Sequence, residues 1–119
     1  MTWDIADENN PKLRKVSEWI NLTDYRTLEA RTGVYIFADD DFDVKYIGKA
    51  GGRRMVVESD NDTIKNLFEV YSAIYRKKGT GATKVKALYT YRDTQALTLE
   101  GELIKKYSPP NNGIDLLNS

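Results

Sequence analysis

A glutamate on the apolar side of a predicted helix carries the clearest chemical signal in the sequence. The helix is expected over residues 94–107, and its apolar stripe is formed by Ala96, Leu99, Leu103, Ile104 and Tyr107. Glu100 falls inside this stripe. A carboxylate that faces a core costs free energy unless it is paired or binds a cation. Glu100 is therefore expected to pair with a Lys or Arg, to supply charge at a functional site, or to reach solvent from the edge of the stripe.

Two tyrosines and a basic, glycine-containing stretch are the next candidates. Tyr35 and Tyr46 each lie in a predicted strand, where the simple interpretation is packing at the core or rim with a satisfied hydroxyl. Lys49, Arg53 and Arg54 flank two glycines. Backbone amides combined with three cations suit a phosphate, although such a stretch is also typical of a solvated turn. It is not a Walker loop, because the Gly-Lys-Ser/Thr ending is absent.

The composition restricts which chemistry is available. The chain has 119 residues, 40% of them hydrophobic and 30% charged, with 18 basic and 18 acidic side chains. It contains neither cysteine nor histidine. Disulfides, thiolate nucleophiles and zinc ribbons are therefore excluded, as is a histidine general base. Any reaction must use Asp, Glu, Lys, Arg, Tyr, Ser or Thr side chains, or a bound metal.

Charge is distributed unevenly along the chain. Residues 1–43 carry 5 basic and 10 acidic side chains, whereas residues 44–119 carry 13 basic and 8 acidic ones. This asymmetry could orient an anionic ligand. We expect the positive potential to concentrate around Lys49 and Arg54, with nucleic-acid contacts from Lys45, Arg53, Lys84 and Lys86. No apolar run approaches the ~20 residues that a bilayer span needs, so we expect a soluble, cytoplasmic protein that makes no membrane contact.

The pattern along the chain predicts a small α+β domain. A helix is expected from Asn10-Pro11 through Asn21, and strands 34–38 and 44–48 should form a hairpin across an acidic turn at 39–41. A second helix begins at Asp62, carries an apolar face through Tyr75 and ends at residues 79–81. Residues 84–91 alternate as a half-buried strand, and the last helix is stopped by Pro109-Pro110. The expected fold is a single domain with a short three-stranded antiparallel sheet flanked by helices, plus an extra N-terminal helix.

Two separate motifs resemble those of a known family. Gly33-Val34-Tyr35, followed after ten residues by residues 46–50 (Tyr-Ile-Gly-Lys-Ala), resembles the motif that names the GIY-YIG nuclease superfamily. Residues 96–105, followed by Pro-Pro-Asn-Asn at 109–112, resemble its C-terminal motif. The resemblance covers roughly residues 32–112. It implies a GIY-YIG-like nuclease domain at 32–119, with residues 1–31 as a helical extension packed on it. The family includes homing endonucleases, some restriction enzymes and the incision domain of bacterial nucleotide excision repair.

The resemblance implies a role for each matching residue. Tyr35 and Tyr46 would lie at the active site, one of them helping to deprotonate water. Lys49 would assist at that base or at the phosphate. Glu100 would be the sole protein carboxylate holding one divalent cation, Mg²⁺ or Mn²⁺. Asn112 would form hydrogen bonds within the site.

One part of the chain departs from the family pattern. The family's catalytic arginine falls at a position that Val56 occupies here, with Arg53 and Arg54 just before it. Residues 55–63 also lack the Tyr or His that the family places after this arginine. A shortened loop would let Arg54 reach the phosphate, and Tyr71 or Tyr75 could replace the missing ring.

Three functions are compatible with these observations. The first is a metal-dependent endonuclease that hydrolyses DNA phosphodiester bonds, in which the metal and an arginine neutralise the phosphate. The second is a catalytically weakened GIY-YIG-fold module that binds nucleic acid or protein. The third is an unrelated small-molecule-binding protein with a salt-bridged Glu100. If the chain cuts DNA, making two strand breaks with one site per chain would favour a homodimer or higher oligomer.

The two arginines give a direct test of the displaced-arginine hypothesis. If Arg54 contacts the transition state, Arg54→Ala should lower DNA cleavage about a hundredfold or more, because a charge contact at the phosphate is lost. Arg53→Ala, the matched control, should mainly weaken binding. Single-turnover nicking of supercoiled plasmid separates the two effects. Equal and mild effects of both substitutions would show that neither arginine occupies the catalytic position.

Overall fold

The fold was described from a computed structural model, which places residues 1–50, 74 and 80–112. The elements in chain order are the 3-10 helix η1 (Ile5–Asn9), strands β1 (Leu13–Val16) and β2 (Ile20–Asn21), the 3-10 helix η2 (Leu22–Thr27), strands β3 (Gly33–Ala38), β4 (Val44–Ala50) and β5 (Lys84–Thr90), and helix α2 (Asp93–Tyr107). The strands form one antiparallel sheet in the order β1-β5-β3-β4, and β2 also pairs with β5. The α+β class is as predicted.

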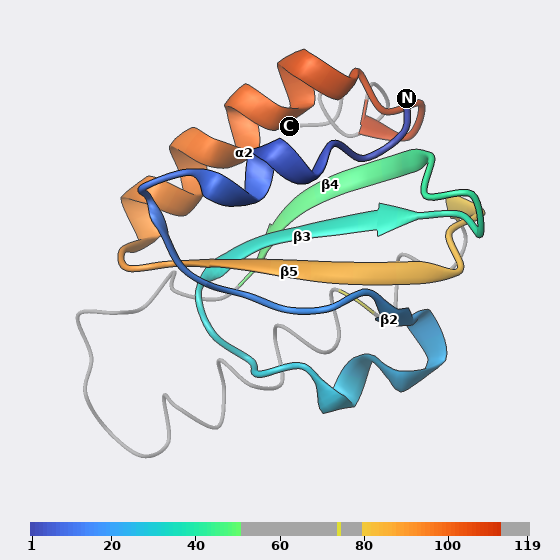
Figure 1. Ribbon diagram of the computed structural model, residues 1–119, viewed down its shortest axis with the longest axis horizontal. Helices are drawn as coiled ribbons and strands as arrows, with labels where there is room; N and C mark the ends of the chain where they lie inside the picture. The colour runs from blue at the N-terminus through green and yellow to red at the C-terminus, as the bar shows by residue number, and fades with distance from the viewer. Residues whose placement is uncertain (51–73, 75–79, 113–119) are drawn as a thin grey trace.

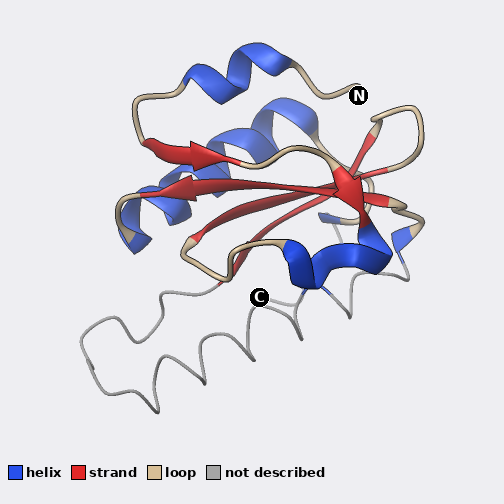
Figure 2. Ribbon diagram, turned by 60° about the horizontal axis from the view of Figure 1, so that its bottom comes forward, coloured by secondary structure: helices blue, strands red, loops and turns tan. Residues whose placement is uncertain are grey.

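The sheet separates two apolar clusters. Helix α2 and η1 lie on one side of it, and η2 lies on the other (Figures 1 and 2). The cluster on the α2 side includes Val34, Ile36, Ile47, Leu88, Leu99 and Leu103. The cluster on the η2 side includes Tyr35, Phe37, Tyr89, Leu22, Tyr25 and Ile74. The alternation of side chains along β3 thus feeds both clusters.

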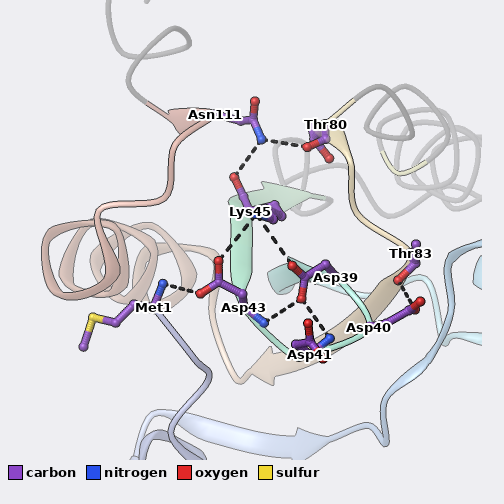
Figure 3. A network of polar contacts seen from close by, with 9 residues as sticks. All are labelled: Met1, Asp39, Asp40, Asp41, Asp43, Lys45, Thr80, Thr83 and Asn111. Carbon is purple, nitrogen blue, oxygen red and sulfur yellow. Dashed lines mark hydrogen bonds and ion pairs between the residues drawn. The ribbon is translucent and has the colours of Figure 1, made fainter.

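The predicted hairpin is confirmed, and its turn is fixed by polar contacts. β3 and β4 pair from Gly33↔Ala50 to Ala38↔Val44, with a bulge that leaves Lys45 without a cross-strand partner on β3. In the turn the Asp39 carboxylate accepts the backbone N–H groups of Asp41 and Asp43, at 2.9 and 3.0 Å. Lys45 Nζ lies 3.6 Å from Asp39 and 3.4 Å from Asp43 (Figure 3). The positive charge of Lys45, at the start of β4, thus partly neutralises the acidic turn.

The expected N-terminal helix is wrong. Residues 13–16 and 20–21 are strands that pair with β5, and Ser17 reinforces the pairing through its backbone N–H to Ala87 O. Asn10 does cap a turn, since its side chain accepts the Lys12 N–H at 2.9 Å, but the chain then extends. Pairing gives β5 a hydrogen-bonded neighbour on its second side, and this tertiary gain exceeds a weak helix propensity. The described sheet therefore has five strands instead of three.

Strand β5 is confirmed, but it is not half-buried. Every residue from Val85 to Thr90 is buried, because β5 lies inside the sheet and both its faces are covered. Helix α2 also matches its prediction and ends where Ser108 adopts φ = 44°, directly before Pro109. The helix expected from Asp62 lies outside the described residues, except that Ile74 is helical and buried. Among the described residues, no helix is both long and apolar enough to cross a membrane.

Gly33 is required by the close approach of two strands. A Cβ at this position would lie 2.5 Å from Leu88 O and 3.0 Å from Tyr89 Cα, both backbone atoms that cannot rotate away. In contrast, a Cβ on Gly101 of α2 meets nothing within 4 Å. The first glycine of the hairpin motif therefore permits β3 to pair with β5.

This contrast predicts opposite effects of the same substitution. Gly33→Ala should lower the free energy of unfolding by about 1–3 kcal/mol, because the strands must shift. Gly101→Ala should raise it by about 0.5–1 kcal/mol, because alanine is the better helix former. Urea unfolding followed by circular dichroism measures both. A Gly33→Ala protein as stable as the parent would contradict the close approach described here.

Candidate active site

Two of the candidate residues, Glu100 and Asn112, bind the outer edge of β4. This strand is at the end of the sheet, so its outward backbone groups need partners from outside the sheet. The Asn112 side chain supplies two: its Oδ1 accepts the Ile47 N–H at 2.8 Å and its Nδ2 donates to Ile47 O at 2.7 Å. Asn111 donates to Lys45 O through its backbone N–H, at 3.2 Å, and through Nδ2, at 3.1 Å. Asn112 is only 3% exposed, so its amide acts as a buried substitute for a further strand.

Glu100 occupies the next position along the same edge. Its carboxylate accepts a hydrogen bond from the backbone N–H of Lys49, and the side chain is half-buried. Burial raises the pKa of Glu100 above its ordinary value, although the Lys49 N–H and the Lys49 charge both act to lower it. The structure therefore places this carboxylate in a partly dehydrated position with incomplete compensation of its charge.

The Lys49 ammonium is held by a carboxylate that the sequence motifs do not include. Lys49 Nζ lies 2.7 Å from Asp93 Oδ1, and the two side chains are 17% and 29% exposed. Thr32 Oγ1 donates to the same Asp93 oxygen at 3.2 Å. Asp93 is the first residue of α2, where a negative charge is favoured by the helix dipole. The sequence could have indicated Asp93 only as an acidic residue at the start of a helix. Nothing in the sequence indicates that Asp93 contacts Lys49.

Both motif tyrosines lie on the face of the hairpin that points away from α2. The Tyr46 ring lies over Gly48, since a Cβ on that glycine would be 2.8 Å from Tyr46 Cε1. Tyr35 is directly across the hairpin from Gly48. Gly48 precedes Lys49 in the chain, and because Gly48 has no side chain, the Tyr46 ring has room beside Tyr35.

The two tyrosines differ in exposure. Tyr35 is 1% exposed, and its hydroxyl donates to Arg31 O at 3.0 Å. Tyr46 is partly exposed and packs against Phe37, with ring centroids 5.8 Å apart. Of the two phenols, Tyr46 is thus the one that can meet solvent.

The four residues expected to bind nucleic acid do not form one group. Lys45 and Lys84 lie at the hairpin-turn end of the sheet, opposite to the end at which Lys49 lies. Lys86 is 6% exposed, with Nζ 2.7 Å from Ser17 O and over the Trp19 ring at 5.5 Å, so it makes internal contacts. Arg53 lies outside the described residues, as do Arg54, Tyr71 and Tyr75.

The arrangement could hold a divalent cation through one carboxylate. No group of three or more Asp, Glu, His or Cys side chains that could bind a metal occurs within residues 1–50, 74 and 80–112. Glu100 nevertheless fits a site with a single protein ligand, because Mg²⁺ keeps several waters and uses one or two carboxylates together with substrate phosphate. A cation at Glu100 would also compensate a charge that burial disfavours.

Comparison with known proteins gives the same family as the motifs. The family model described as the UvrC-like GIY-YIG domain matches residues 31–113. Three similar proteins are each named UvrABC system protein C. The one from Pseudoalteromonas translucida is 31% identical over 106 residues, covering 82% of this chain and 15% of the relative. Those from Pseudomonas syringae pv. tomato and Dictyoglomus thermophilum are 34% and 40% identical, over 72% and 68% of this chain and 13% and 12% of the relatives. The chain thus spans less than a sixth of the length of these relatives.

The raised pKa of Glu100 gives a prediction for stability in metal-free buffer. The folded protein binds this proton more tightly than the unfolded chain, so ionised Glu100 destabilises the fold at neutral pH. Glu100→Gln should therefore be at least as stable as the parent at pH 7, and it still offers an oxygen to the Lys49 N–H. The gain should disappear as the pH falls below the ordinary value of 4.5.

Thermal unfolding in EDTA between pH 4 and pH 8 measures this difference. Glu102→Gln is the matched control, because Glu102 is exposed on the same helix and pairs with Lys12 at 3.5 Å. It should show no gain that grows with pH. A Glu100→Gln protein that unfolds well below the parent at pH 7 would instead make Glu100 a structural partner of the Lys49 charge.

Proposed function

The chain belongs to the UvrC-like GIY-YIG family, and from this membership we propose that it is a divalent-metal-dependent endonuclease that hydrolyses DNA phosphodiester bonds. Residues 32–119 would form the nuclease domain, with residues 1–31 packed on it. The observation that carries the proposal is the contact between Glu100 and the backbone of Lys49, which joins the two family motifs at one edge of the sheet. With this function we propose an intracellular, cytoplasmic location.

Each residue near this edge receives a role from its surroundings. Glu100 would hold Mg²⁺ or Mn²⁺, which supplies positive charge to the phosphate oxygens. Tyr46, the more exposed phenol, would contact the attacking water, and the buried Tyr35 would support that position from the neighbouring strand. Lys49 would face the phosphate or the water. Asn112 would keep β4 in place by bonding both backbone groups of Ile47.

The Asp93 carboxylate would orient the Lys49 ammonium. A lysine side chain has four rotatable bonds, so a fixed partner at 2.7 Å restricts where its charge can lie. Electrostatic stabilisation of a phosphoryl transition state depends on charges that are positioned before the reaction. Asp93 is therefore proposed as a positioning residue and not as a group that touches the substrate.

A second candidate function has a specific observation in its favour. Val56 stands where the family has its catalytic arginine, and the Lys49 charge is partly neutralised by Asp93. A domain that lacks a free cation at the phosphate would bind DNA or protein without efficient cleavage. The proposed endonuclease instead requires Arg54 to supply that cation.

A plasmid-nicking assay tests the endonuclease proposal. The parent should convert supercoiled plasmid to the open circle in Mg²⁺ or Mn²⁺ and should be inactive in EDTA. Glu100→Gln should lower the rate at least about a hundredfold, because it removes the charge that holds the cation. Glu102→Gln makes the same chemical change on the exposed side of α2 and should leave the rate close to that of the parent.

The outcomes separate the two candidate functions. Metal-dependent nicking that Glu100→Gln abolishes and Glu102→Gln preserves supports the endonuclease. A folded parent that binds DNA but does not nick in either metal favours the weakened module. Nicking that survives Glu100→Gln removes Glu100 from the site. Because two strand breaks with one site per chain favour two copies acting together, the rate of linear product should rise more steeply than in proportion to protein concentration if the chain forms dimers or larger oligomers on DNA.

A further inference from the structure

Three cations of the N-terminal segment converge on a single carboxylate. Arg14 and Arg31 lie 3.5 and 3.3 Å from Glu29 Oε1, and Lys15 lies 3.4 Å from its Oε2. We refer to Arg14, Lys15, Glu29 and Arg31 as the β1 surface. It carries two excess positive charges although residues 1–43 carry a net charge of −5, so three of the five cations in that acidic stretch meet at one point.

These side chains remain available to a ligand. Arg14, Lys15 and Arg31 are 36%, 58% and 61% exposed, and Glu29 is 35% exposed. Exposed ion pairs of this kind contribute little to stability, so fold stability alone gives little reason to gather three cations here. Arginine also offers a planar fork of donors that matches a phosphate group. The surface therefore has the charge and the donor types that a polyanion requires.

The β1 surface is linked to the candidate active site by direct contacts. The Arg14 guanidinium lies 5.5 Å from the centre of the Tyr89 ring, and the Tyr89 and Tyr35 rings meet edge to face at 6.3 Å. The Tyr89 hydroxyl donates to Glu29 O at 2.6 Å, and the Tyr35 hydroxyl donates to Arg31 O. The backbone that carries Glu29 and Arg31 thus holds both phenols, one of which belongs to the first family motif.

The sheet sets the backbone spacing between the strand that carries Lys15 and the end of β4. Lys15 pairs with Tyr89, Tyr89 with Gly33, and Gly33 with Ala50, so one row of residues crosses from the β1 surface to the residue after Lys49. Three strand spacings of about 4.8 Å give about 14 Å along this row.

We propose that the β1 surface binds phosphates of the DNA backbone outside the place where the phosphodiester lies at Glu100. The inference rests on the proposed function, because it takes DNA as the substrate, and it adds a contact region in a segment that lies almost entirely outside the stretch matched by the family model. Glu29 keeps the three side chains together when no DNA is bound and competes with phosphate for them.

Equilibrium binding in EDTA tests the surface without cleavage. The probe is a fluorescein-labelled 30-base-pair duplex, and anisotropy is measured over a range of NaCl concentrations. Arg14→Gln combined with Arg31→Gln should weaken binding and reduce the slope of log K against log salt by about two, because two phosphate contacts are lost. The control combines Lys12→Gln with Lys105→Gln, which removes the same charge elsewhere and should leave the slope nearly unchanged.

Glu29→Gln should change the DNA affinity in the opposite direction and is therefore the sharper test. Removing the competing carboxylate should tighten binding roughly fivefold at low salt. A cluster that only stabilises the fold would instead lower the melting temperature without a gain in affinity. If the Arg14/Arg31 double variant proves unfolded by circular dichroism, Lys15→Gln and Glu29→Gln decide the question with opposite expected signs.

The outcomes distinguish this inference from the proposed function. Three results would overturn the proposed role of the β1 surface. The double variant could bind as tightly as the control, Glu29→Gln could bind no more tightly than the parent, or the parent could fail to bind the duplex. If the parent nicks plasmid while these variants bind DNA like the parent, the endonuclease proposal is supported and only the role of the β1 surface is contradicted. A parent with the predicted binding changes but no nicking supports the surface and contradicts the endonuclease.

Discussion

The closure of the outer edge of β4 is the constraint on which the site depends. An edge strand presents unpaired backbone groups, and a buried unpaired group costs free energy. Here Asn112 binds both backbone groups of Ile47, and Glu100 accepts the N–H of Lys49. The second family motif therefore closes the strand that carries the first one. This explains physically why two motifs that lie some fifty residues apart meet at one edge of the sheet.

The same contact relates the structural and chemical interpretations of Glu100. Its hydrogen bond to Lys49 satisfies an edge N–H, a task that a neutral glutamine could also perform. Its charge, in contrast, is not needed for that bond and is disfavoured by burial, which raises its pKa. The Lys49 ammonium lies 2.7 Å from Asp93, and its charge lowers the pKa of Glu100 less than burial raises it. A carboxylate at a position where an amide would close the edge equally well supports the proposal that Glu100 binds a cation.

Local patterns predicted the elements that local interactions determine. The hairpin from Gly33 to Ala50 and helix α2 were predicted within a few residues, because strand alternation, turn chemistry and a terminal proline specify them. Residues 13–21 were not, because their strand conformation depends on pairing with β5, about seventy residues away. Lys86 was mistaken for a surface cation for the same reason: its charge is balanced by Glu8 and Ser17 O, which β1 and η1 bring to it. The position of Glu100 in the apolar stripe could be predicted from its helix, but its partner on β4 could not.

The N-terminal segment is more than a cover for the family domain. Without β1 and β2, strand β5 would itself be an edge strand, and its outward backbone groups would need other partners. The segment also ends in the backbone carbonyls that receive the Tyr35 and Tyr89 hydroxyls, so the position of a motif tyrosine depends on residues 29–31. Buried hydroxyls need such acceptors, because an unsatisfied one costs about 1–3 kcal/mol. Residues 29–31 therefore fix the hydroxyl of Tyr35, and Tyr35 is paired across the hairpin with Gly48, the residue before Lys49.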